Sequence, residues 1–178
     1  MASTMFFFYL KQTVRILLLL VLLLILIRTV VIEPGRINGR SMEPTFLDDD
    51  LFFINKFLLL FREPRRGDLV QVMDASTQKV LIKRVVGLPG EVLSIHNGKV
   101  FLVDELHQEQ QLEEPYLDRF TRTMAADEKD TVYLPVNPNS YFLMGDNRPM
   151  STDSRVYGAV HRRFIYGLVM RAPFLKRH

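Results

Sequence analysis

The 178-residue sequence contains no cysteine. This absence excludes disulfide bonds, thiol nucleophiles and cysteine-ligated zinc. The four histidines stand at positions 96, 107, 161 and 178, form no HExxH or similar pattern, and none is predicted to act as a catalytic base. We therefore expect no metal ion and no cofactor. A serine nucleophile in such a chain would need a base other than histidine.

The sequence also lacks a strong excess of charge of one sign. Its 23 lysine and arginine residues are balanced by 20 aspartate and glutamate residues, which leaves a net charge of +3. Because no dense basic face is present, we expect no nucleic-acid partner. The acidic triplet at 48–50 has no second acidic cluster at ligand-like spacing, so we interpret it as a solvated turn.

One long hydrophobic run lies near the N-terminus. Residues 16–27 read ILLLLVLLLILI, and the run continues to residue 32 after Arg28. A helix of this length spans roughly 25 Å, and the phenylalanines at 6–8 can extend it toward the thickness of a bilayer. No small-x-small cleavage motif follows in RTVVIEPG, which favours an uncleaved signal-anchor over a cleaved signal peptide. Pro34 and Gly35 are predicted to end the helix.

The charges that flank this run do not fix its orientation strongly. Lys11 and Arg15 lie on one side, and Arg28, Arg36 and Arg40 lie on the other. We favour a cytoplasmic N-terminus, with the bulk of the chain outside a single-pass anchor in the plasma membrane. The expected organisation is a cytoplasmic tip and transmembrane segment at 1–33, followed by one domain at 34–178.

The rest of the chain has the pattern of β-structure. Short apolar segments rich in branched or aromatic residues are typical of strands, and they occur at 51–55, 69–72, 80–86, 141–144 and 164–170. In EVLSIHNGKVFLV at 91–103, Asn97-Gly98 between two apolar runs indicates a hairpin, and GLPG at 87–90 indicates a turn. The polar residues 104–130 are expected to form an insertion or small excursion. The predicted fold is a compact, mainly β domain behind one N-terminal helix.

Two positions raise a question of chemistry. Ser41, in GRSMEPTF at 39–46, follows the apolar run closely and is either a turn residue or a nucleophile. Lys83 lies in VLIKRVV at 80–86, a segment apolar enough to be a buried strand, where a lysine is unexpected. A free lysine is neutral in only about one molecule in 2,500 at pH 7, but burial can remove its proton and make it a base. A lysine that snorkels from an edge strand is an equally good interpretation of this segment alone.

A third stretch is dense in polar groups. MGDNRPMSTDSR, at 144–155, combines one glycine, two serines, a threonine, two aspartates, an asparagine and two arginines directly after an apolar strand. Such density is typical of a hydrogen-bonded loop that organises a site, although composition alone would favour a solvated loop.

Together, GRSMEPTF, KRVVGLPGE and GDNRPMSTDSR, in this order behind an N-terminal anchor, resemble the conserved boxes of bacterial type I signal peptidases. These are membrane-anchored serine endopeptidases with a Ser-Lys dyad and a characteristic β fold. The resemblance covers the anchor and most of residues 34–170, whereas 104–130 has no recognisable counterpart.

The resemblance implies a role for each matching residue. Ser41 would be the nucleophile and Lys83 the general base, while Ser151 would bond the Lys83 amine and hold it toward Ser41. Asp153 and Arg155 would form a structural ion pair. The remaining loop residues, Asp146, Asn147 and Arg148, would shape the loop.

The resemblance leaves the oxyanion-binding group incomplete. Some members of the family have a serine two residues before the nucleophile, and this position is Gly39 here. The Ser41 N–H would remain as one donor, with the group at Gly39 in doubt. The loss of one donor reduces transition-state stabilisation by about 2.7–4 kcal/mol unless a backbone group replaces it.

The resemblance also implies the substrates. The family cleaves secretory preproteins after small-x-small (Ala-x-Ala) sequences at the membrane, near the protein-export translocon. Shallow pockets would be lined by Met42, Phe46, Leu81 and Ile82, although each is nearly as well explained as ordinary core. LFFINKFLLLF at 51–61 is too apolar for a soluble surface and too short to span a bilayer, so 57–61 is a candidate for contact with the lipid interface.

Three other classes of protein fit less well. A self-cleaving repressor or polymerase-accessory protein shares the Ser-Lys chemistry, but it would have a DNA-binding module or cleavable arm where this chain has an apolar run. A non-enzymatic anchored scaffold would not need both Ser41 and Lys83 in their motifs. An organelle member of the same family is less consistent with the bacterial form of the last motif.

Overall fold

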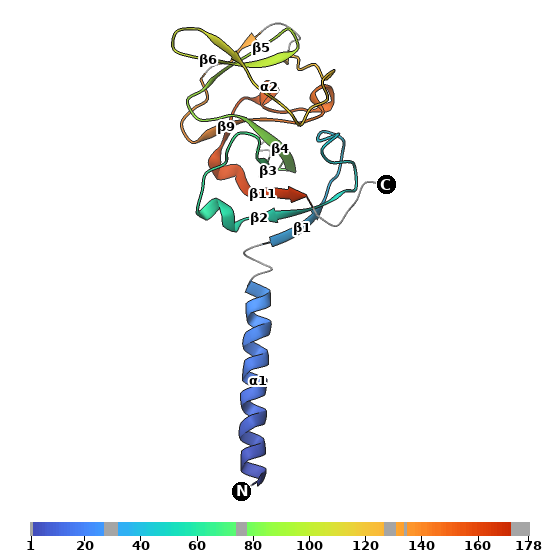
Figure 1. The fold of residues 1–178 in the computed structure, drawn as a ribbon, viewed down its shortest axis with the longest axis vertical. Coiled ribbons are helices and arrows are strands. Elements are labelled where there is room, and N and C mark those ends of the chain that lie inside the picture. Colours follow the sequence, from blue (N-terminus) through green and yellow to red (C-terminus); the bar gives the residue numbers. More distant parts are fainter. Residues whose placement is uncertain (1, 27–31, 74–77, 127–130, 134, 172–178) are drawn as a thin grey trace.

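A computed structural model describes residues 2–26, 32–73, 78–126, 131–133 and 135–171. It shows a mainly β domain built of two antiparallel sheets, together with one long N-terminal helix (Figure 1). The mainly β fold expected from the sequence is therefore confirmed. The four-stranded sheet lies at the end of this domain remote from α1, and β1 and β2 lie at the near end (Figure 1).

The N-terminal helix α1 spans Ala2–Leu26. Its segment Met5–Ile25 is long and apolar enough to cross a membrane and is not buried against the β domain. The helix begins well before the predicted start of the apolar run and includes Lys11 and Arg15. The predicted end at residue 32 is wrong, because Ile32 begins a strand; the run between Leu26 and Ile32 lies outside the described residues.

Pro34 and Gly35 do not end the helix. They lie within strand β1 (Ile32–Arg36), where Pro34 faces Phe53 and Gly35 faces Phe52 of strand β2. Proline is tolerated in β1 because this strand is at the edge of its sheet, where a missing N–H breaks no ladder. Glycine is required for a different reason: a Cβ on Gly35 would lie 2.4 Å from Cζ of Phe52.

The larger sheet has seven antiparallel strands. Their order is β1, β2 (Leu51–Asn55), β11 (Ile165–Arg171), β3 (Leu69–Met73), β4 (Val80–Gly87), β9 (Ser140–Met144) and β10 (Val160–His161). Strand β4 is therefore an interior strand, between β3 and β9. Its side chains are shielded by neighbours on both edges, which excludes the edge-strand alternative for Lys83.

The smaller sheet has the order β7 (Glu109–Gln111), β6 (Lys99–Val103), β5 (Val92–His96) and β8 (Thr131–Val132). The predicted hairpin is confirmed, because β5 and β6 pair from His96 opposite Lys99 outward. Asn97 and Gly98 both have positive φ, 51° and 76°, as a two-residue turn of this kind requires.

The predicted strands at 51–55, 69–72, 80–86, 141–144 and 164–170 are also confirmed within one or two residues. Sequence reasoning missed β1, β7, β8 and β10, because strands this short or this polar leave no period-2 signal. The short helices are η2 (Phe57–Leu60), η3 (Arg148–Met150), α2 (Ser154–Tyr157) and η4 (Arg162–Phe164).

Three buried clusters hold these elements together. One joins the smaller sheet to β9 through Leu93, Ile95 and Phe142, and a second fills the larger sheet around Val70, Val85 and Leu143. The third cluster includes Met42, the residue next to Ser41. Its members are Ile37, Met42, Phe46, Phe52, Ile54 and Val169. This third cluster anchors the chain between β1 and β2 to the sheet.

The contact between Gly35 and Phe52 gives a test of the β1 strand. Gly35→Ala would force the Phe52 ring out of the third cluster, and we expect it to lower the free energy of unfolding by about 1–3 kcal/mol. Urea unfolding followed by circular dichroism measures this loss. In a double-mutant cycle, Phe52→Leu makes room for the methyl group, so the losses should not add. Full additivity would contradict this packing.

Candidate active site

Ser41 lies in a tight loop between β1 and β2. The loop is closed at its base by hydrogen bonds from Ile37 N–H to the Asp50 carbonyl (2.9 Å) and from Asp49 N–H to the Ile37 carbonyl (3.0 Å). The next residue, Met42, is only 2% exposed in the third cluster. Burial of its neighbour thus fixes Ser41 on the sheet, while the Ser41 side chain remains partly accessible.

A cavity of about 290 Å³ opens beside Ser41. The sequence-predicted residues Met42, Leu81 and Ile82 line it, together with Gly39 and Ser41 itself. Phe46 is fully buried and is not among the lining residues, so it occupies the ordinary core position that the sequence left open. Gln71 of β3, which faces Ile82 of β4, adds a polar group to the wall that sequence reasoning did not identify.

Lys83 is buried in the middle of strand β4. It lies opposite Val70 of β3 and is 2% exposed. Its Nζ donates a hydrogen bond to Ser151 Oγ at 2.9 Å. The structure therefore brings together the lysine and the serine that the sequence assigned as its partner.

Burial lowers the pKa of Lys83 below its ordinary value of 10.5, because the charged ammonium loses its hydration. Asp153 acts in the opposite direction and Arg155 acts in the same direction as burial. These two residues form a buried ion pair, with Arg155 Nε and Nη2 each 2.8 Å from an Asp153 carboxylate oxygen. Their opposite charges partly offset each other near the lysine, so desolvation dominates.

The Asp153 carboxylate is ionised in this pair. Burial alone would raise the pKa of Asp153, but the hydrogen bonds and charge of Arg155, together with the Gly145 N–H, hold it below its ordinary value. Arg155 also donates to the carbonyls of Arg148 (2.7 Å) and Ser151 (3.1 Å). The pair thus positions the backbone of the loop that contains Ser151.

Gly145 is the point of closest approach between this loop and Ser41. A Cβ at this position would lie 2.2 Å from Ser151 Oγ and 2.5 Å from the Ser41 carbonyl oxygen. No side chain larger than hydrogen fits there without displacing one of the two serines. The glycine therefore lets the Ser41 loop and the Ser151 loop meet.

Asp146 and Asn147 hold the Ser41 loop through hydrogen bonds. The Asn147 N–H donates to the Ser41 carbonyl at 3.0 Å, and its side-chain amide donates to the Arg40 carbonyl at 3.0 Å. Asp146 accepts from Thr45 Oγ1 at 2.5 Å. Its second partner is Arg84, which binds the carboxylate through Nε and Nη2 at 2.8 and 2.5 Å.

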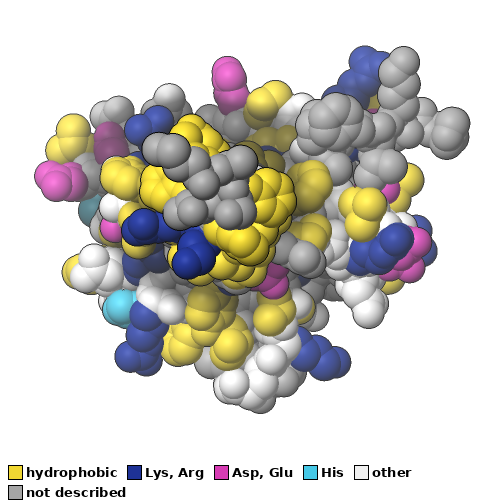
Figure 2. All heavy atoms as spheres, turned by 90° about the horizontal axis from the view of Figure 1, so that it is seen from below, with side chains coloured by type: hydrophobic (Ala, Val, Ile, Leu, Met, Phe, Trp, Pro, Cys, Tyr) yellow, Lys and Arg dark blue, Asp and Glu magenta, His cyan; other side chains and the backbone are white. Residues whose placement is uncertain are grey.

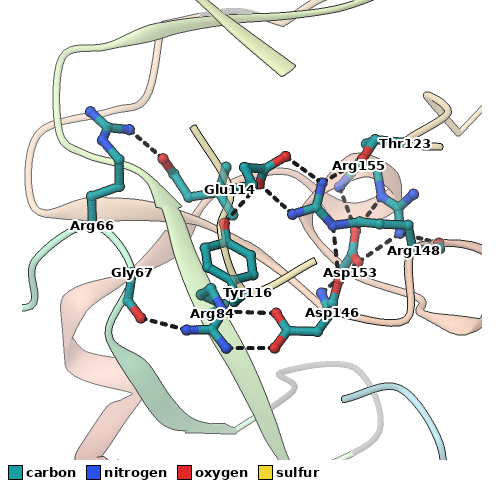
Figure 3. Close-up of polar contacts among 12 residues, drawn as sticks. Arg66, Gly67, Arg84, Glu114, Tyr116, Thr123, Asp146, Arg148, Asp153 and Arg155 are labelled. Atoms are coloured by element: carbon teal, nitrogen blue, oxygen red, sulfur yellow. Dashed lines mark hydrogen bonds and ion pairs between the residues drawn. The ribbon is translucent and has the colours of Figure 1, made fainter. Parts of the chain in front are cut away.

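Residues 104–130 are not simply an excursion from the sheet. Glu114 of this segment forms a two-point ion pair with Arg148, a residue that is only 2% exposed (Figure 3). Thr123 accepts a hydrogen bond from the same guanidinium. Buried arginine charge requires partners, and the described part of this polar segment supplies two of them, Glu114 and Thr123.

Gly39, the predicted oxyanion position, has a left-handed backbone conformation and an N–H that is already hydrogen-bonded. Its φ of +105° is a conformation that favours glycine, and its N–H donates to Asp48 Oδ1 at 2.8 Å. A side chain two residues before Ser41 is thus absent, and the backbone N–H at this position already has a partner. Asp48 and Asp50 both bond N–H groups within this loop.

Sequence reasoning missed several residues of the site. For Arg84 the sequence contained a signal. A buried strand with one charged side chain is already unusual, and this strand has two adjacent charged side chains, Lys83 and Arg84. Glu114 and Tyr116 had none, because they stand in a polar segment without periodicity. Their partners are distant in the sequence, and contacts of this kind follow from the tertiary fold.

In this antiparallel β domain, Ser151 bonds the buried Lys83 amine, and the Ser151 hydroxyl and the Ser41 carbonyl both lie against Gly145. With the partly accessible Ser41, this arrangement defines a candidate serine hydrolase. The comparisons with known proteins agree. The family described as "Signal peptidase, peptidase S26" matches residues 10–173. The chain is 32% identical over 154 residues to signal peptidase I V of Bacillus subtilis (strain 168), covering 82% of this chain and 88% of that protein. It is 33% identical over 129 residues to signal peptidase I P of Bacillus subtilis subsp. natto, covering 72% and 69%.

A solved structure is also similar. The crystal structure of a signal peptidase I from Enterococcus faecalis V583 has a TM-score of 0.49 and 24% identity, covering 60% of this chain and 97% of that one. The chain belongs to the S26 family of signal peptidases, as the match over residues 10–173 shows. It is a serine endopeptidase of the signal peptidase I type.

Proposed function

We propose that this protein removes signal peptides from secretory preproteins, with Ser41 as nucleophile and neutral Lys83 as general base. One observation carries the proposal: the Lys83 amine is buried, has a lowered pKa, and bonds Ser151 beside the nucleophile loop. Family membership supports the reaction class, and the geometry supports the assignment of roles.

In this mechanism the Lys83 Nζ accepts the Ser41 hydroxyl proton while Ser41 Oγ attacks the scissile carbonyl carbon. The resulting ammonium then gives its proton to the leaving amine, and an acyl-enzyme forms. Water hydrolyses this ester, with Lys83 again accepting the proton. Ser151 holds the amine in position throughout, because its hydroxyl can accept from either protonation state of the lysine.

The Ser41 N–H is the proposed first donor to the oxyanion. The group at Gly39 is the proposed second position. In the structure the Gly39 N–H donates to Asp48, so it can serve the oxyanion only if that bond is released when substrate binds.

The cavity beside Ser41 accounts for a preference for small side chains. Met42, Leu81 and Ile82 give this cavity of about 290 Å³ apolar walls. Alanine-sized groups at the first and third positions before the scissile bond fit such walls, whereas larger groups clash. We propose cleavage after Ala-x-Ala on this basis.

The membrane placement is part of the same proposal. α1 is exposed and long enough to cross a bilayer as a single-pass anchor, with its N-terminus in the cytoplasm and the catalytic domain outside, near the export translocon.

A second contact with the membrane is proposed for the β domain. The short helix η2, drawn in teal in Figure 1, lies at the end of the β domain nearer α1. Seen from this end, hydrophobic side chains gather around α1 and in further groups on the β domain (Figure 2). Leu60 and Phe61, 72% and 71% exposed, suit contact with the lipid interface.

The catalytic assignment is tested with the full chain in detergent and a preprotein that carries an Ala-x-Ala site. Ser41→Ala and Lys83→Met should each reduce the rate by roughly 10⁴-fold or more, because each removes a group that acts as part of one unit. N-terminal sequencing of the product locates the cut. Phenylalanine at the position before the cut should prevent cleavage by the wild type.

The matched controls are Ser94→Ala, a buried serine of β5, and Lys99→Met, an exposed lysine of β6. Both should retain activity. Cleavage that survives Ser41→Ala would contradict the mechanism.

If Leu60 contacts the lipid interface, its substitution should affect cleavage of a membrane-bound substrate and not cleavage of a soluble one. Leu60→Glu should reduce cleavage of a preprotein in liposomes about tenfold, because a charged group is expelled from the interface, and leave cleavage of a soluble peptide unchanged. Leu106→Glu, at a 77% exposed leucine after β6, is the matched control. Equal activity of both variants in liposomes would remove the proposed contact.

A further inference from the structure

We propose that Glu114 and Tyr116 are positioning residues that set the distance between the Ser41 loop and the loop holding Lys83 through Ser151. The inference rests on the proposed function, and it assigns a role to two residues of the polar segment after β6. Two routes of contact lead from the stretch Glu114-Pro115-Tyr116, one to each loop, and both pass through a buried arginine (Figure 3).

The first route runs from Glu114 to the Ser151 loop. The Glu114 carboxylate binds Nη1 and Nη2 of Arg148, and its side chain is 10% exposed. Arg148 then donates from Nε to the Gly145 carbonyl at 3.1 Å. The Gly145 N–H donates to Asp153 at 2.9 Å, so the peptide units on both sides of this glycine are fixed.

Fixing Gly145 matters because both the Ser41 carbonyl and the Ser151 hydroxyl lie against it. The Ser41 carbonyl and Ser151 Oγ both approach its Cα too closely for a Cβ to fit. A displacement of Gly145 toward either side would therefore move Ser41 or Ser151. Through Ser151, it would also change the position and hydration of the Lys83 amine.

The second route runs from Tyr116 to the Ser41 loop. The Arg84 guanidinium stacks on the Tyr116 ring, with 3.8 Å from Cζ to the ring centroid. Arg84 binds Asp146 through two hydrogen bonds, and Asp146 accepts from Thr45 in the nucleophile loop. The ring thus supports the arginine that ties the nucleophile loop to Asp146.

The two routes meet in one hydrogen bond. The Tyr116 hydroxyl donates to Glu114 Oε1 at 2.7 Å. Burial, followed by the charge of Glu114 and the hydrogen bond to it, raises the pKa of Tyr116, so the phenol stays protonated and remains a donor across the working pH range. Neither Glu114 nor Tyr116, nor the arginine that each contacts, lines the cavity beside Ser41, which is why we assign positioning roles.

Tyr116→Phe tests the inference with little disturbance, because the ring under Arg84 stays and one hydroxyl is lost. We expect kcat at pH 7 to fall roughly threefold to tenfold, as the loss of one hydrogen bond allows, with KM for the Ala-x-Ala preprotein unchanged. If the loops loosen and water reaches Lys83, the pKa of the amine rises toward its ordinary value. The ascending limb of the pH–rate profile then moves to higher pH.

Glu114→Gln should change the same two readouts in the same direction and by more. The controls are Tyr166→Phe, whose hydroxyl contacts Met73 on the large sheet, and Glu113→Gln, at an exposed neighbour of Glu114. Both controls should keep the wild-type profile.

Two results would overturn the inference. One is that Tyr116→Phe has the same kcat and the same pH–rate profile as the wild type. The other is that activity falls only in proportion to the fraction of unfolded protein, while the ascending limb of the pH–rate profile stays in place. This second result would indicate a purely structural role. If Glu114→Gln does not fold, Tyr116→Phe decides alone. Cleavage by the Ser41→Ala variant at the wild-type rate would instead refute the proposed function.

Discussion

The burial of one lysine amine is the constraint on which the rest of this structure depends. A charged ammonium in the interior of a sheet is unfavourable, because it loses its hydration. Lys83 lies in an interior strand, and its amine has Ser151 as a hydrogen-bond partner. The same desolvation that destabilises the charged amine lowers its pKa, which is what the proposed role as a base requires. Folding and the proposed catalysis thus oppose each other at this residue.

The surrounding charges are arranged so that this effect is not cancelled. Arg84, Arg148 and Arg155 are all buried, and each is matched by a carboxylate: Asp146, Glu114 and Asp153. An unmatched carboxylate close to Lys83 would stabilise the ammonium and keep it protonated. Matched pairs hold the loops with strong hydrogen bonds while adding little net charge. This explains how a site so rich in ions can still contain a lysine with a lowered pKa.

Sequence reasoning predicted the parts of the molecule that depend on local pattern. The branched strands at 51–55 and 80–86 and the turn at Asn97-Gly98 are local signals, and the three motifs identified the family. It failed at Pro34-Gly35, where edge position in a sheet decides the outcome. It also failed at Glu114 and Tyr116, whose arginine partners, Arg148 and Arg84, lie 34 and 32 residues away. Positions fixed by packing between distant segments have no signature in a single sequence.

The central claim is that Lys83 is more easily deprotonated than an ordinary lysine. The most direct measurement is an NMR titration of the Lys83 side chain in the full chain with Ser41→Ala, in detergent, using lysine labelled at Cε. Loss of the signal in Lys83→Met assigns it. The account predicts a titration midpoint for Lys83 clearly below the ordinary value of 10.5. A midpoint for Lys83 at or above the ordinary value would contradict the account, because the amine would then be protonated when Ser41 must be activated.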